Sequence, residues 1–171
     1  LPANLLPFLL NEVTQAGLDL LLASVAYGAA QVLVLAPPHK RDEQDGLKGQ
    51  IDLANVILDG LGYGDNRLEM IDEADPAAVE NRLYSLPDFA SEDAATFIAP
   101  GQKRQRLNQI LGSLHQQAPH PVDVIELEKG APFGAVIVDA AGCTLCLSCV
   151  NACPAKALRD NPDAPELRFE E

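Results

Sequence analysis

The chain has 171 residues, of which 47% are hydrophobic, and a formal net charge of −13. This apolar content is that of an ordinary globular protein, and the negative charge argues against nucleic acid as a partner, because phosphate backbones are bound by lysine and arginine. The longest apolar runs are broken by polar residues such as Asp19, Ser24 and Tyr27, so none reaches the roughly 20 residues of a membrane-spanning helix.

The N-terminal part of the chain predicts alternating helices and strands. Apolar positions recur at helical spacing from about residue 11 to Gly28, and the continuous apolar run 31–36 is typical of a strand buried on both faces. Residues 42–60 predict a second amphipathic helix. Glycines 60, 62 and 64 then predict a turn that leads into a strand at residues 67–72.

Further along, Asp75 and Pro76 predict the start of a short helix that ends near Tyr84, with the aspartate as N-cap. Residues 96–99 and 122–127 predict short extended pieces, separated by a helix from about 100 to 117. This alternation predicts an α/β fold class over residues 1–130: a small parallel sheet with flanking helices in a Rossmann-like three-layer arrangement.

This first domain offers only weak site candidates. Glycines 60, 62 and 64 follow a helix and precede a strand, which is not the order of a dinucleotide-binding fingerprint. Residues 101–104 could bind an anion at a helix start, although a solvated first turn is the commoner case. The three histidines (His39, His115 and His120) lack metal-binding spacing, and no catalytic site is predicted.

All four cysteines lie in one run, Cys143, Cys146, Cys149 and Cys153, with the spacing C-x2-C-x2-C-x3-C-P. This spacing is typical of thiolates that wrap a [4Fe-4S] cluster, and small neighbours such as Ser148 and Ala152 let backbone N–H groups approach the cluster sulfides. A disulfide pair is disfavoured, because adjacent cysteines gain little closure entropy. A zinc site, which more often uses two separated pairs, stays open as the alternative.

Residues 134–171 resemble the first half of a bacterial two-cluster ferredoxin, with 134–139 as its first strand and 149–158 as its helix. The resemblance implies that Cys143, Cys146 and Cys149 hold one [4Fe-4S] cluster and that Cys153 ligates a second. The alternative is a single cluster held by all four cysteines. A second cysteine run would be expected after Glu171, so the sequence is interpreted as part of a longer protein, with a truncated ferredoxin-like module at 131–171. Such a piece could lack its cluster.

Residues from about 12 to 84, with the apolar run 31–36 and Pro37-Pro38 after it, resemble the delta subunit of methyl-viologen-reducing hydrogenases. That family uses cysteines in this region, whereas this chain has none before Cys143. The resemblance implies a docking scaffold that has lost its own cluster. The combination with a ferredoxin module is also similar to large bacterial iron–sulfur proteins, some encoded near formate dehydrogenases.

Two functional hypotheses follow. In the first, the chain is an electron-transfer component that relays electrons in a larger oxidoreductase system, such as a formate dehydrogenase or a hydrogenase/heterodisulfide-reductase-like system, and its acidic surface docks a redox partner. In the second, the four thiolates close a zinc site in an interaction domain without a redox role. Cysteines confined to one run favour a reducing compartment, the cytoplasm.

Overall fold

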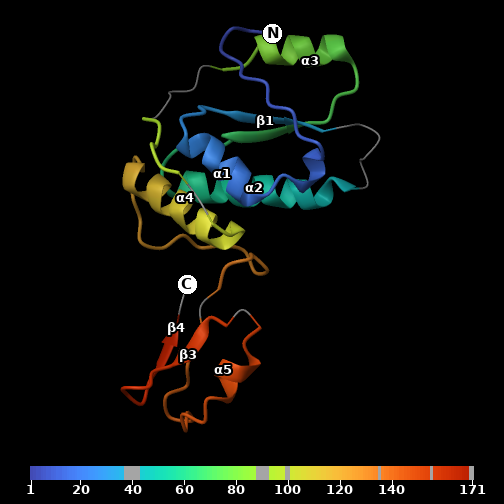
Figure 1. Ribbon diagram of the computed structural model, residues 1–171. Helices are drawn as coiled ribbons and strands as arrows, with labels where there is room; N and C mark the ends of the chain where they lie inside the picture. The colour runs from blue at the N-terminus through green and yellow to red at the C-terminus, as the bar shows by residue number, and fades with distance from the viewer. Residues whose placement is uncertain (37–42, 88–92, 99–100, 135, 155, 170–171) are drawn as a thin grey trace. The chain divides into compact units, whose positions relative to one another are not determined.

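The computed structural model divides into two compact units, Leu1–Ala131 and Pro132–Glu171 (Figure 1). The structure describes residues 1–36, 43–87, 93–98, 101–134, 136–154 and 156–169. In these ranges, no helix has both the length and the apolar character that crossing a membrane requires. We describe each unit by itself.

The first unit is built on a two-stranded parallel sheet. Strand β1 (Val32–Leu35) pairs with β2 (Leu68–Ile71), with Val32 opposite Leu68, and helix α2 (Asp45–Gly60) connects them. These elements confirm the strands predicted at 31–36 and 67–72, and the glycine turn before β2 is confirmed by the positive φ of Gly62 (84°) and Gly64 (91°). A parallel pair requires a crossover of this kind, because a hairpin can only return the chain antiparallel.

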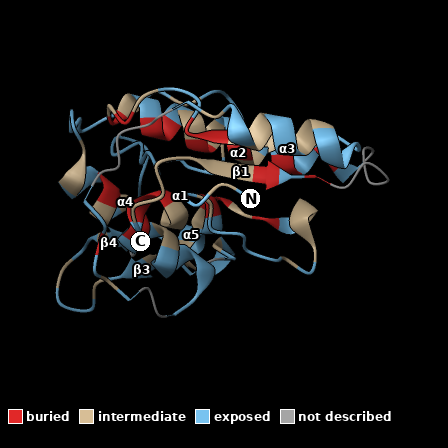
Figure 2. Cartoon of the chain, turned by 90° about the horizontal axis from the view of Figure 1, so that it is seen from above, coloured by how far each residue is buried: buried red, intermediate tan, exposed pale blue. Residues whose placement is uncertain are grey.

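Helices α1 (Leu18–Ala26), α2 and α4 (Lys103–Gln117) lie on one side of this sheet, with α1 and α2 packed against its strands (Figure 1). Helix α1 follows a short 3-10 turn, η1 (Val13–Gln15), and α4 packs against α1. The helix expected from about residue 11 therefore begins late, because Gly17 takes an extended conformation at the N-cap of α1. Buried residues line the facing sides of the helices and strands (Figure 2), and Leu22, Leu47, Leu58 and Leu114 are fully enclosed.

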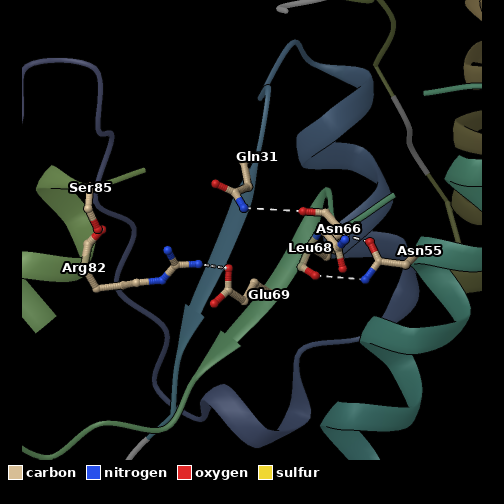
Figure 3. A network of polar contacts seen from close by, with 7 residues as sticks. All are labelled: Gln31, Asn55, Asn66, Leu68, Glu69, Arg82 and Ser85. Atoms are coloured by element: carbon tan, nitrogen blue, oxygen red, sulfur yellow. Dashed lines mark hydrogen bonds and ion pairs between the residues drawn. The ribbon is translucent and has the colours of Figure 1, made fainter. Parts of the chain in front are cut away.

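The two faces of the sheet differ in character. Val34 and Leu68 are buried in the core, whereas Glu69 points to the opposite face and forms an ion pair with Arg82, with 2.6 Å between Oε2 and Nη2 (Figure 3). Arg82 belongs to α3 (Pro76–Tyr84), whose N-cap is the predicted Asp75, with its carboxylate accepting from the Ala77 N–H. Helix α3 thus lies across the sheet from the other three helices.

An asparagine side chain closes part of the outer edge of β2. The Asn55 amide of α2 accepts a hydrogen bond from the Leu68 N–H at 2.9 Å and donates one to the Leu68 carbonyl at 2.8 Å (Figure 3). The side chain therefore replaces a neighbouring strand at this residue, which satisfies backbone groups that would otherwise be left unpaired next to the core.

The prediction of further strands in this unit was wrong for residues 122–127. These residues form no strand, although Ile125 and Leu127 pack against the core while Val124 is 79% exposed. The alternating pattern instead belongs to a segment whose apolar side chains pack on the C-terminal end of α2, where the Ile125 side chain lies next to Gly60. Residues 96–98 also form no strand, and Ala99 lies outside the described residues, so the described sheet of this unit has two strands and a Rossmann-like three-layer arrangement is not confirmed.

The second unit contains a small antiparallel pair and one short helix. Strand β3 (Leu158–Asp160) pairs with β4 (Leu167–Phe169), and α5 spans Ser148–Ala152. The helix expected over 149–158 ends early because Cys153 takes an extended conformation before Pro154, which lacks the N–H that a helix needs. The predicted strand at 134–139 is absent in its described part: residues 136–139 pair with no strand and Ile137 is 92% exposed.

Candidate functional site

The cysteine run occupies the loop before α5 and the helix itself. Cys143 and Cys146 lie in the loop, Cys149 lies in the first turn of α5, and Cys153 is its C-cap. None of the four is in a disulfide; Cys143, Cys146 and Cys149 are exposed, and Cys153 is half-buried. The site is thus an accessible group of thiols on one short stretch of chain.

Left-handed residues give this loop its shape. Leu145 has φ of 53° and Leu147 has φ of 60°, both in a region that residues with a Cβ seldom adopt. Left-handed residues set among others turn successive N–H groups toward one side, which is the backbone concavity found at many phosphate and iron–sulfur sites. Such strained residues tend to gather at functional sites.

Backbone–backbone hydrogen bonding stops at this loop in the part of the chain that the structure describes. Among the described residues, none of the N–H groups of residues 143–147 donates a backbone–backbone hydrogen bond, whereas the helix that follows is internally bonded, as with the Cys153 N–H to the Cys149 carbonyl at 3.0 Å. Hydrogen bonds from such groups to cluster sulfides tune a cluster's potential.

Ser148 forms a hydrogen bond with the Cys146 thiol that lowers the pKa of this thiol. Its Oγ lies 3.4 Å from the Sγ of Cys146, and this side-chain hydrogen bond, with smaller help from the Ser148 N–H and the Thr144 hydroxyl, holds the pKa of Cys146 below its usual range. The hydroxyl donates to the thiolate form and so stabilises it. The sequence identified Ser148 as a small neighbour only; its hydroxyl is an additional contribution.

A hollow of about 370 Å³ lies beside the loop and is lined by Cys143 and Cys149. Its other lining residues are Val136, Ile137, Val138, Asp139, Gly142, Leu158 and Leu167. Cys146 and Cys153 are not among them. The structure therefore brings the first and third cysteines to one hollow whose other lining side chains are mostly apolar.

The thiols are not gathered around one point. In the described parts of the chain, no three His, Cys, Asp or Glu side chains are placed to hold a single metal ion. A cube of four irons is larger than one ion and is ligated at its corners, so thiolates around it stand further apart than those around zinc. The donor set itself, four thiols with N–H groups beside them, has the chemistry that an iron–sulfur cluster requires.

Comparison with known families bears directly on this loop. Residues 136–159 match the model of the 4Fe-4S binding domain family. The match indicates 4Fe-4S cluster binding by this stretch. The match contains all four cysteines, the short helix α5 and most of the hollow's lining, and it confirms a ferredoxin-type segment within the chain.

The other comparisons add no relative. No curated protein and no solved structure matches the chain. The likeness to a hydrogenase delta subunit, expected over residues 12–84, therefore remains a prediction. The same holds for the bacterial origin and for the number of clusters.

The weak candidates in the first unit have ordinary structural roles. Of the two cations in the anion candidate at 101–104, Lys103 lies 3.7 Å from the carboxylate of Asp19 in α1, which Arg106 also approaches at 3.5 Å, and Arg104 is exposed. The ring of His115 contacts the Val122 carbonyl at 3.1 Å, and the backbone N–H of His120 bonds to the Leu61 carbonyl. His39 lies outside the described residues.

The Ser148 contact predicts a pH effect on thiol reactivity in the metal-free chain. In a variant whose only cysteine is Cys146, alkylation by iodoacetamide should rise with pH through a lowered thiol pKa. Ser148→Ala should raise that pKa, so its rate profile should shift to higher pH, while Ser148→Thr, which keeps a hydroxyl, should stay near the parent profile. Coincident profiles for the parent and S148A would contradict the assignment.

Proposed function

We propose that the chain is an electron-transfer component of a larger oxidoreductase system, with Cys143, Cys146 and Cys149 as thiolate ligands of one [4Fe-4S] cluster. The observation that carries the proposal is the match of residues 136–159 to the 4Fe-4S binding domain. When bound, the cluster accepts and releases single electrons.

The chain's own residues supply the site. The three thiolates would hold iron, N–H groups of residues 143–147 would hydrogen-bond to the sulfides, and apolar side chains would stand beside the cluster next to Cys143 and Cys149. We propose that Cys153 does not ligate this cluster and that the fourth iron takes its ligand from outside the run. One observation supports this division: Cys153 is half-buried, whereas Cys143, Cys146 and Cys149 are exposed.

We propose further that the two parts of the chain have different roles, one in cluster binding and the other in docking. Residues 131–171 carry the cluster, and the α/β domain at 1–130 docks a redox partner of formate dehydrogenase or hydrogenase/heterodisulfide-reductase type in the reducing cytoplasm. The formal charge of −13 supports a partner with a basic surface, because complementary charge accelerates encounter. Association should then weaken as salt is raised.

Reductive titration tests the proposed function. Protein reconstituted anaerobically with iron and sulfide should absorb broadly near ~400 nm, as thiolate-ligated iron–sulfur centres do, and dithionite should bleach this band reversibly. A colourless protein that takes up one zinc instead would favour the zinc-stapled interaction domain and contradict electron transfer.

A further inference from the structure

Asp139 stands out because it lines the hollow beside the cysteine loop, next to Cys143 and Cys149. We propose that Asp139 is a positioning residue for Cys143 and that its charge lowers the reduction potential of the cluster bound there. This inference rests on the proposed function and assigns a further residue to the same site.

Asp139 organises the turn that leads into Cys143. Its Oδ1 accepts a hydrogen bond from the Ala141 N–H at 3.0 Å, and its backbone carbonyl accepts one from the Gly142 N–H at 3.2 Å. Aspartate commonly fixes a turn in this way, by bonding to a backbone group two residues on. The two N–H groups immediately precede the first cysteine, so the aspartate sets the direction in which the loop starts.

The carboxylate also folds back over the turn. A Cβ added at Gly142 would lie 3.0 Å from the Asp139 Oδ2, so glycine at 142 leaves room for the acid beside Cys143. Both carboxylate oxygens are therefore placed against the turn that carries the first thiol. The geometry keeps the side chain near the hollow even though Asp139 is exposed.

Charge gives Asp139 its second effect. Among the described residues that line the hollow, Asp139 is the one charged side chain other than the thiols themselves; the rest are apolar or glycine. Reduction adds negative charge to a cluster, and a nearby like charge disfavours the more negative state. Net charge around a cluster is one of the determinants of its potential. Asp139 therefore favours the oxidised form.

The Asp139→Asn substitution tests the effect of the charge separately from the effect of the hydrogen bond that fixes the turn. The asparagine carbonyl oxygen can still accept from the Ala141 N–H, but the negative charge is gone. We expect wild-type iron per chain and a higher midpoint potential, with a roughly threefold higher reduced-to-oxidised ratio at the wild-type midpoint at low salt, as expected for one unit charge at the surface of the site. Added salt should shrink this difference, because the carboxylate is exposed.

Asp163→Asn is the matched control. Asp163 is exposed in the same unit, between β3 and β4, and does not line the hollow. The Asp163→Asn substitution removes the same charge and should leave the midpoint potential of the cluster close to that of the wild type. Asp139→Ala, which loses both charge and turn, should in addition lose bound iron faster under a chelator than D139N.

The outcomes separate the two proposals. Iron-loaded D139N with the wild-type potential at low salt, or a D163N shift as large as that of D139N, would overturn the charge effect. Equal rates of iron loss in D139A and D139N would overturn the positioning role. A wild-type chain that binds zinc and no iron would overturn the proposed function itself, and the inference with it.

Discussion

Replacing Cys143, Cys146 or Cys149 with serine is expected to abolish stable cluster binding. Each variant removes one thiolate from the set that holds the cube, and a serine hydroxyl is a poor substitute for a soft sulfur ligand. After anaerobic reconstitution and desalting, iron per chain should fall at least several-fold, together with the visible absorption band. Iron assay and absorption spectra measure both.

Cys153→Ser is the matched comparison for these variants. Cys153 differs from the other three in being half-buried, at the end of α5, whereas Cys143, Cys146 and Cys149 are exposed. The C153S variant should keep most of the iron and most of the visible band. Iron loss in C153S equal to that in C143S would contradict the assignment and would indicate a single cluster ligated by all four cysteines.

Leu22→Ala is expected to destabilise the first unit strongly. Leu22 of α1 is fully buried in the core between α1, α2 and α4. Removing a buried leucine side chain costs about 2–5 kcal/mol of unfolding free energy, because apolar contacts are lost and a cavity remains. Urea unfolding followed by circular dichroism measures the change in midpoint.

Leu20→Ala on the same helix serves as the control. Leu20 is 37% exposed, so the same truncation opens no enclosed cavity and should cost less than half as much as L22A. Equal decreases in unfolding free energy for L22A and L20A would mean that the core does not lie on the side of α1 that faces α2 and α4.

The sequence predicted those features that depend on local pattern. The apolar run at 31–36 became β1, the strand predicted at 67–72 after the glycine turn became β2, and Asp75 with Pro76 capped α3 as expected. The cysteine spacing predicted an iron–sulfur segment, and the match of residues 136–159 to the 4Fe-4S binding domain supports that prediction.

Features that depend on tertiary partners were not predictable. Apolar and polar residues alternate over 122–127 as in a strand, yet this segment packs on α2 without pairing to a strand among the described residues. Alternation indicates that one side of a segment is buried, but not that a neighbouring strand is present. Leu145 and Leu147 adopt left-handed conformations that leucine does not signal. For Asp139 the sequence could indicate only its turn, because an aspartate followed by small residues often accepts a hydrogen bond from the N–H two residues on. Its position beside Cys143 and Cys149 could be seen only in the structure.

Iron and acid-labile sulfide per chain, measured after anaerobic reconstitution in the presence of both iron and zinc, test the central claim most directly. The account predicts iron and sulfide in nearly equal amounts, approaching about four of each per cluster, with a visible band that dithionite bleaches. Zinc at one per chain without sulfide, in protein that stays folded, would contradict it.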